Sequence, residues 1–339
     1  MRAFLALLPL LPSVLSLPTP KPLFGIDLSS IGDKISSAVG LGPSTSDDSS
    51  SDKPTPVSTD DITKNLVRPA QFSRVAYCPS EQITAWKCGK PCEELKGIKF
   101  LQSGGDAGLV PLYFIAHDTQ EETLVVAHEG TDPFKFLSII NDAKFKLVAL
   151  NASRFPEAAG TDIQVHDGFQ ETFERTADGL LSGVKAGLAS TGVKKVLVTG
   201  HSLGAALASM TGALIKDNVG SDVDVTVTTF GMPRGGNKAW ADFLDSKLGL
   251  TFVTNKHDPV PIVPPKSLGF QHSSGEIHIN GDQTDLVACE GQDNINCSTG
   301  NSLINFNVVN HLGPYFNDIT FGSPECADFS VIGAVAGNF

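Results

Sequence analysis

Short apolar runs alternate with longer, partly polar segments along the chain from residue 112 onwards. The runs predict strands at Leu112–Ala116, Thr123–His128, Lys195–Thr199, Asp224–Phe230 and Leu250–Asn255. Two of the intervening segments predict helices: Phe169–Ser190, from its apolar spacing, and Ala205–Lys216, which has no proline and one interior glycine. This order is typical of βαβ units. It predicts an α/β fold with a mainly parallel central sheet flanked by helices, and antiparallel strands at its start.

The stretch VLVTGHSLGAALASMTG, residues 196–212, joins a predicted strand to a predicted helix. A plain turn would explain its G-x-S-x-G pentapeptide, and the pattern alone is weak. Strand, sharp turn and helix are, however, the setting of a nucleophile elbow, which predicts that Ser202 is a nucleophile. Gly200 and Gly204 let strand and helix approach closely, and the helix start offers N–H groups to negative charge. We expect His201 to be held by local packing.

A serine hydroxyl needs a histidine base, and the base needs a carboxylate to orient it. In this type of fold the chain order is serine, then acid, then histidine. Asp258 follows a predicted strand and directly precedes a proline, where a turn former is the alternative reading. Of the later histidines, His311 lies in VVNHLGPYF, typical of a loop at a strand end, and is the preferred base. His272 and His278 lie in an alternating, strand-like segment that favours structural histidines.

The negative charge on a tetrahedral intermediate needs hydrogen-bond donors. The backbone N–H of Leu203 is the first, because this residue follows the nucleophile, and a loop after an earlier strand supplies the second. The segment LVVAHEGTDPF, residues 124–134, offers such a loop, in which Thr131 has both an N–H and a hydroxyl to donate. A plain turn explains GTDP equally well as local chemistry, and only the triad favours Thr131.

The segment PFKFLSIINDAKFKL, residues 133–147, directly follows this loop. Its apolar residues recur at helical spacing with lysines and an aspartate between them, which predicts an amphipathic helix. An ordinary core-facing helix is one interpretation. The position beside the site favours a short helical lid that opens when its apolar face meets lipid.

Composition and the first sixty residues limit the class of protein. The chain has 339 residues, 41% of them hydrophobic and 18% charged, which is globular, and its net charge of −12 argues against a nucleic-acid partner. Residues 1–16 predict a secretory signal peptide, and no later segment is apolar enough to be transmembrane. Residues 17–59 predict a possible propeptide and flexible linker, and residues 60–339 one domain. We therefore expect a secreted, extracellular protein.

Six cysteines fit an oxidising compartment, and their even number allows three disulfides among fifteen pairings. Zinc is the rival interpretation for Cys88 and Cys92, but no histidine pair of suitable spacing accompanies them, so we expect no metal. Asn151 and Asn296 begin N-glycosylation sequons.

Together these pieces resemble the fungal class 3 lipase family, the α/β-hydrolases that include secreted filamentous-fungal triacylglycerol lipases and some feruloyl esterases. The resemblance covers residues 70–320 and is carried, in the family's order, by GTDP, VHDGF, VTGHSLGAALA, TFGMPRGGN, HDPVPIVPP, GFQHSSGEIHI and NHLGPYF. It implies a triad of Ser202, Asp258 and His311, with an oxyanion hole of Thr131 and Leu203. It also implies the disulfides Cys78–Cys326, Cys88–Cys92 and Cys289–Cys297. Glu129 departs from the arginine that many members carry there.

We therefore expect a triacylglycerol lipase, a serine carboxylic-ester hydrolase that forms an acyl-serine and needs no cofactor. Its expected partners are acylglycerol substrate and the lipid–water interface. The alternatives are a feruloyl-type esterase for soluble esters and a catalytically silent lipid-binding protein.

Overall fold

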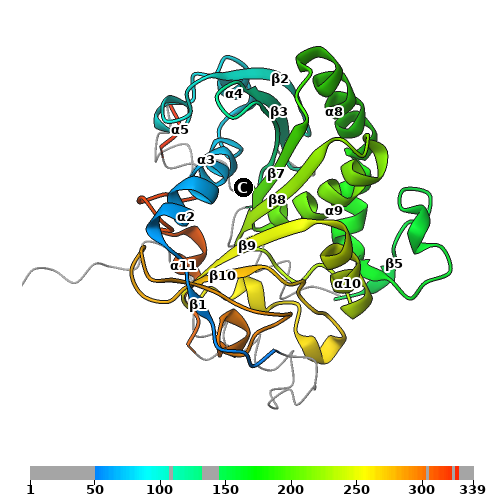
Figure 1. Ribbon diagram of the computed structural model, residues 1–339, viewed down its shortest axis with the longest axis vertical. Helices are drawn as coiled ribbons and strands as arrows, with labels where there is room; N and C mark the ends of the chain where they lie inside the picture. Colours follow the sequence, from blue (N-terminus) through cyan, green and yellow to red (C-terminus); the bar gives the residue numbers. More distant parts are fainter. Residues whose placement is uncertain (1–49, 107–109, 132–144, 303–304, 323–324, 328–339) are drawn as a thin grey trace, which may run out of the picture.

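The structure, a computed structural model, describes residues 50–106, 110–131, 145–302, 305–322 and 325–327. A nine-stranded sheet crosses the molecule in the order β1-β11-β10-β9-β8-β7-β4-β3-β2 (Figure 1). Its strands are β1 (Thr55–Pro56), β2 (Ile98–Gly104), β3 (Tyr113–Asp118), β4 (Thr123–His128), β7 (Lys195–His201), β8 (Asp224–Phe230), β9 (Gly249–Asn255), β10 (Glu276–Ile279) and β11 (Leu286–Ala288). Strands β4, β7, β8, β9 and β10 run parallel to one another. Beyond them, at both edges of the sheet, each strand pairs with its neighbour in the antiparallel direction. The predicted α/β fold with a mainly parallel sheet is confirmed.

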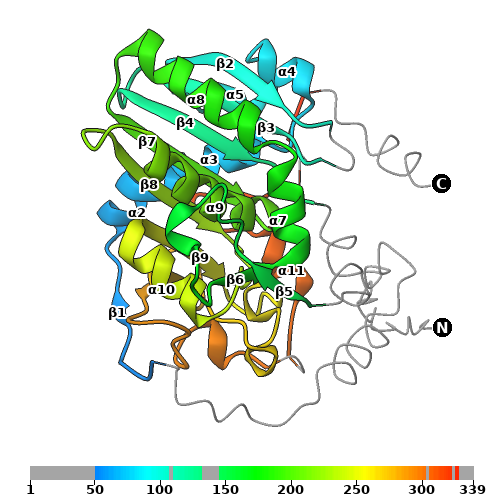
Figure 2. The same ribbon diagram turned by 90° about the vertical axis from the view of Figure 1, so that its right-hand side faces the viewer.

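Helices cover both faces of this sheet. One face carries α7 (Asp167–Glu174), α8 (Ala177–Thr191), α9 (Leu203–Asn218) and α10 (Lys238–Lys247), as Figure 2 shows. The other carries α2 (Thr59–Asn65) and α3 (Val67–Val75), with the short α4 (Ser80–Thr84) and α5 (Lys90–Glu93) near β2. A small sheet of β5 (Leu147–Ala149) and β6 (Gln164–His166), the helix α11 (Val308–Leu312) and four 3₁₀ turns complete the described structure: Pro156–Ala158, Val260–Ile262, Lys266–Leu268 and Ser298–Gly300.

The single helix predicted at 169–190 is two helices, α7 and α8. The backbone N–H and the hydroxyl of Thr176 both donate to the carbonyl of Phe173, at 3.1 and 3.3 Å. A continuous α-helix would use that carbonyl for the N–H of residue 177. The i→i+3 bond therefore closes α7, and α8 starts with a bond from Leu180 to the carbonyl of Thr176.

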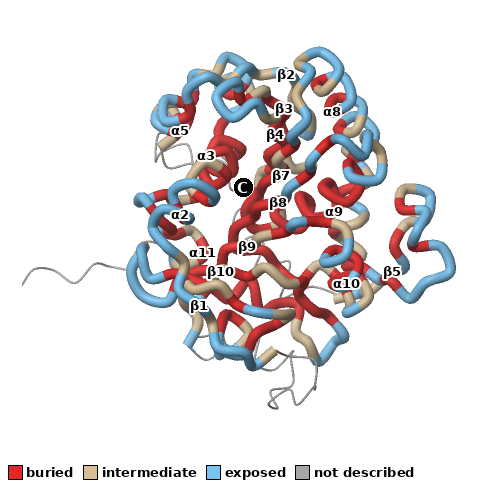
Figure 3. The backbone as a smooth tube through the Cα atoms, viewed as in Figure 1, coloured by how far each residue is buried: buried red, intermediate tan, exposed pale blue. Residues whose placement is uncertain are grey.

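Burial increases toward the carboxyl ends of the central parallel strands, as the tube coloured by burial shows (Figure 3). In β7, β8 and β9 the first residue is exposed and the last four are all buried. Helix α9 is buried from Gly204 to Ile215, and its small residues let it lie close to the sheet. A β-carbon added to Gly212 would collide with Val227 of β8. Loops that leave these strand ends are therefore anchored on rigid elements.

The edges of the large sheet are irregular. At one edge, β2 pairs with β3 through a register shift between Phe100 and Gln102. At the other, β1 is two residues long, includes Pro56 and pairs with β11. The exposed positions of β2 include Lys99.

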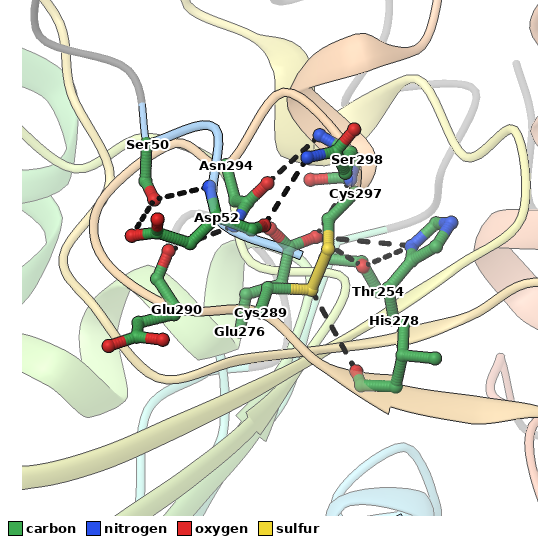
Figure 4. Close-up of a disulfide and its surroundings, with 12 residues drawn as sticks. Ser50, Asp52, Thr254, Glu276, His278, Cys289, Glu290, Asn294, Cys297 and Ser298 are labelled. Atoms are coloured by element: carbon green, nitrogen blue, oxygen red, sulfur yellow. Dashed lines mark hydrogen bonds and ion pairs between the residues drawn. A yellow bond between two sulfur atoms is a disulfide. The ribbon is translucent and has the colours of Figure 1, made fainter. Parts of the chain in front are cut away.

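Residues 50–57, at the end of the stretch expected to be a linker, lie along β11 and the loop after it (Figure 4). The N–H of Ser50 donates to Gln292, and the side-chain amide of Asn294 donates to the carbonyl of Asp52 at 2.9 Å. Residues 1–49, which include the predicted signal peptide, lie outside the described residues.

The side-chain amide nitrogens of both sequon asparagines take part in this folded structure. That of Asn296 donates to the carbonyl of Ser51 at 3.0 Å, and that of Asn151 donates to Glu174 at 2.7 Å. Glycosylation at either residue stays a prediction.

The six cysteines form Cys78–Cys326, Cys88–Cys92 and Cys289–Cys297, the pairs that the family resemblance implies. The first joins the end of α3 to the last described segment, and the third closes the loop that binds residues 50–52 (Figure 4). Among the described residues, no helix has the length and apolar character that a membrane span requires.

Candidate active site

Ser202 is the single residue between β7 and α9. Its φ of 60° and ψ of −127° are a backbone conformation that residues with side chains seldom adopt. Tight packing imposes this turn. A β-carbon on Gly200 would collide with the carbonyl of Gly204, and the N–H of Ser202 donates to Phe230 at the end of β8, at 3.0 Å. Strand, strained serine and helix therefore form the elbow that the sequence predicts.

The hydroxyl of Ser202 is buried and has no hydrogen-bond partner among the described residues. A buried hydroxyl without a partner costs free energy, which is tolerable where the atom must react. Being the residue before α9, Ser202 also lies at the positive end of the helix dipole.

Asp258 and His311 are joined by a hydrogen bond of 2.8 Å between Oδ2 and Nδ1, and both are almost completely buried. The other oxygen of Asp258 accepts from the N–H of Val260 at 2.8 Å. The carboxylate therefore keeps the hydrogen of His311 on Nδ1 and leaves Nε2 as the basic nitrogen. Nε2 is buried and unpartnered within the described structure, like the hydroxyl of Ser202.

His311 lies on the short helix α11 rather than in the predicted loop. The side chain of Asn307 caps α11 by accepting a hydrogen bond from the backbone N–H of Val309. The backbone N–H of Asn307 donates to the carbonyl of His257, the residue before Asp258. A β-carbon on Gly231, at the end of β8, would lie 2.8 Å from the His311 ring. Ser202 is hydrogen-bonded to Phe230, the last residue of β8, so serine and histidine both lie against the end of this strand.

The two expected oxyanion donors come from adjacent segments. Leu203 is the first residue of α9, so its N–H has no acceptor within the helix. Thr131 follows Gly130 on the loop after β4, and a β-carbon on Gly130 would lie 2.5 Å from the carbonyl oxygen of His201, the residue before Ser202. The loop therefore packs directly against the elbow.

Glu129, at the position where the resemblance implies an arginine in many members, is half-buried on this loop. Its Oε2 accepts the N–H of Leu112 at 2.9 Å. Burial raises the pKa of the Glu129 carboxyl to about 7, although that hydrogen bond opposes the shift.

The two less favoured candidate bases, His272 and His278, have other partners. His272 stacks on Phe252 and shares a hydrogen bond with the carbonyl of Pro261, whereas His278 shares one with the hydroxyl of Thr254. Burial lowers the pKa of each to about 4, so both stay neutral at ordinary pH. Both are buried structural histidines.

Sequence reasoning missed Arg234, which orients the loop after Asp258. This buried guanidinium pairs with Asp293 at 2.8 Å and donates to the carbonyls of Ile262 and Pro264. Its presence in TFGMPRGGN was the available signal, but its side-chain partners lie 28 to 65 residues away. The predicted lid, residues 133–147, lies mostly outside the described residues, which resume at 145.

Within the described ranges, one group of three side chains could offer atoms to a metal ion: Glu276, Cys289 and Cys297. The two sulfurs are bonded to each other, and the Glu276 carboxyl accepts hydrogen bonds from Thr254 and Ser298 (Figure 4). The arrangement at Ser202 is instead suited to nucleophilic attack and acyl transfer.

Comparison with known proteins finds similarity to lipases. The family model described as Lipase (class 3) matches residues 125–268. The secreted mono- and diacylglycerol lipase MDL2 of Malassezia globosa is 30% identical over 277 residues, which cover 79% of this chain and 86% of that enzyme. MDL5 of the same yeast, with the same description, is 33% identical over 196 residues. That match covers 57% of this chain and 62% of MDL5. This chain spans 61 to 64% of the length of each of the first four relatives.

Solved structures show the same fold. Lip2 lipase from Yarrowia lipolytica aligns with a TM-score of 0.69 at 25% identity, over 81% of this chain and 98% of that one. Lipase II from Rhizopus niveus aligns with a TM-score of 0.69 at 24% identity, over 80% and 99%.

Proposed function

Because this chain belongs to the class 3 lipase family, we propose that it is a secreted serine carboxylic-ester hydrolase that cleaves acylglycerols. The observation that carries this proposal is the buried Asp258–His311 pair and the strained Ser202. Nε2 of His311 and the hydroxyl of Ser202 both lack a hydrogen-bond partner among the residues that the structure describes. Two buried polar atoms without partners in the described part of the chain are explained together if a proton passes between them during the reaction.

In the first half of the proposed reaction, Nε2 of His311 takes the proton of Ser202 as the hydroxyl attacks the ester carbonyl. Asp258 stabilises the resulting imidazolium through the bond to Nδ1. The backbone N–H groups of Leu203 and Thr131 donate to the oxyanion. His311 then gives its proton to the departing glycerol oxygen, which leaves an acyl group on Ser202.

In the second half, His311 removes a proton from water, which attacks the acyl-serine. Collapse of the second tetrahedral intermediate releases the fatty acid and returns the proton to Ser202. Catalytic hydrogen bonds are often long without substrate, so the serine–histidine bond is expected to form in the complex.

Mono- and diacylglycerols are the preferred substrates in this proposal, because MDL2 and MDL5 are described as mono- and diacylglycerol lipases. Triacylglycerol is the second candidate. It is favoured by the amphipathic sequence at 133–147, which is typical of a lid that opens at a lipid surface.

We also propose that the protein is extracellular and acts at the lipid–water interface. The relatives MDL2 and MDL5 are described as secreted. Three disulfides are consistent with an oxidising compartment.

A panel of emulsified monoolein, diolein, triolein and a phospholipid, with dissolved methyl ferulate, tests the assignment. Ser202→Ala protein is the control, and a serine-directed organophosphate should label Ser202 in the parent only. We expect faster release of oleate from monoolein and diolein than from triolein. Faster cleavage of triolein would favour the second candidate, and cleavage of methyl ferulate alone would identify a feruloyl-type esterase. Absence of both turnover and labelling would contradict the proposal.

A further inference from the structure

His201, the residue before the candidate nucleophile, is completely buried among aromatic rings. It stacks on Phe321 with 4.2 Å between ring centroids, and its ring lies 4.4 Å from the ring of His311. The expectation that local packing holds His201 therefore describes only part of its surroundings, because one of these neighbours is the candidate base.

The two ring nitrogens of His201 have different partners, and these partners determine the tautomer. Nε2 lies 2.9 Å from the carbonyl oxygen of His311. A carbonyl can only accept, so Nε2 carries the hydrogen. Nδ1 lies 2.5 Å from the hydroxyl of Tyr77, which must therefore donate to it. Burial, together with the charge of His311, lowers the pKa of His201 well below its ordinary value, so the ring stays neutral.

Tyr77 connects this pair to the oxyanion loop. It follows α3, and its neighbour Cys78 is fixed by a disulfide. A β-carbon on Gly130 would collide with the hydroxyl of Tyr77 and would lie 2.5 Å from the carbonyl oxygen of His201. The segment that leads to Thr131 therefore contacts both Tyr77 and His201.

We propose that Tyr77 and His201 are positioning residues, which hold the backbone of His311 and the oxyanion loop in a fixed relation to Ser202. The inference rests on the proposed ester hydrolysis, and neither residue acts on the substrate itself. Tyr77 acts through His201: its hydroxyl selects the tautomer that can donate to the carbonyl of His311.

The neutral state of His201 suits this role. Proton transfer makes His311 an imidazolium, and a second positive ring 4.4 Å away would oppose that charge. The hydroxyl of Tyr315 donates to the same carbonyl at 3.3 Å, which is a weaker contact. His201 is therefore the main hydrogen-bond donor to the backbone of the base.

A double-mutant cycle tests the inference. Tyr77→Phe removes the hydroxyl, His201→Phe keeps a ring for stacking but removes both hydrogen bonds, and the double variant combines them. With dissolved p-nitrophenyl butyrate we expect kcat to fall about tenfold in Tyr77→Phe, which corresponds to about 1.4 kcal/mol in the barrier, while KM changes less than twofold. If Tyr77 acts through His201, the double variant should be no slower than His201→Phe. Multiplicative losses, or an unchanged Tyr77→Phe enzyme, would overturn the inference.

Tyr113→Phe is the matched control, because the hydroxyl of this tyrosine also takes part in a hydrogen bond, which it accepts from Gln102. Tyr113 lies on β3, which is separated from β7 by β4. The substitution should leave kcat unchanged, and an equal loss would indicate a general effect of removing hydroxyls. A readout independent of turnover is the downfield proton resonance of the Nδ1–H of His311. It should shift or broaden in Tyr77→Phe and remain in Tyr113→Phe. If the parent lacks esterase activity, the proposed function fails, and this resonance still decides the positioning role: an unchanged signal in Tyr77→Phe overturns it.

Discussion

The α-carbon of Gly204 lies so close to the backbone of Glu129 that an added β-carbon would be 2.6 Å from the Glu129 carbonyl oxygen. The carbonyl oxygen of His128 would be equally near. Both neighbours are backbone, so neither can rotate away. The contact sets the separation between the start of α9, which provides Leu203, and the loop that provides Thr131.

Gly204→Ala should therefore damage catalysis more than its small volume suggests. We expect kcat to fall by about 10²-fold, comparable with the loss of one oxyanion donor, because the added methyl group separates the two donor segments. Gly179→Ala is the control: this exposed helix residue has only a 3.4 Å contact at its β-position. It should keep full activity and gain up to about 1 kcal/mol from helix propensity. Equal activity of both variants would contradict the assigned oxyanion hole.

Ser202→Ala should abolish ester hydrolysis while the thermal midpoint stays the same or rises slightly. The nucleophile is lost, but the removed hydroxyl is buried without a partner among the described residues, so no hydrogen bond is lost with it. Activity on p-nitrophenyl butyrate, far-UV circular dichroism and calorimetry measure these effects. Retention of a tenth of the parent activity would exclude Ser202 as the nucleophile.

Loss of the Cys78–Cys326 bridge should destabilise the protein far more than loss of Cys88–Cys92. The bridges have sequence separations of 248 and 4, and the chain-entropy model assigns the longer loop about 5 kcal/mol and the shorter one about 2 kcal/mol. Denaturant unfolding of the two double serine variants measures the difference. Equal losses would mean that local packing, rather than loop closure, determines the effect.

Glu129→Gln should stabilise the protein in alkaline but not in acidic solution. The folded carboxyl has its pKa raised from 4.5 to about 7, so between these values the folded chain holds a proton that the unfolded chain has released. The free energy of unfolding therefore falls as the pH rises across this range, by at most about 3 kcal/mol. At pH 8 glutamine should recover much of that loss, and at pH 4 the two proteins should unfold alike. A pH-independent difference in urea unfolding would argue against the raised pKa.

The parts of the site that depend on local pattern were predictable from the sequence. An apolar strand, a glycine-flanked serine and an alanine-rich helix specify the elbow within one continuous segment, because the geometry is set by neighbours in the chain. The position of Asp258 follows similarly from the end of β9 and the proline after it.

Features that depend on distant partners were not predictable in this way. The helix that carries His311 has five residues, too few for a periodic signal, and is held by the Asn307 cap. The bond between Tyr77 and His201 joins residues 124 positions apart. Residues 50–57 have a polar, linker-like composition, yet Thr55 and Pro56 pair with β11. Backbone pairing leaves little trace in the side-chain pattern.

The irregular edges of the nine-stranded sheet also bear on how neighbouring molecules meet. A regular edge strand presents a row of unpaired backbone groups that a second copy can extend, which leads to aggregation. Here Pro56 lacks an N–H on the two-residue strand β1, and a register shift interrupts the opposite edge, where Lys99 adds charge. When molecules crowd together on a surface, neither edge offers a template, so crowding favours separate molecules over a continuous intermolecular sheet.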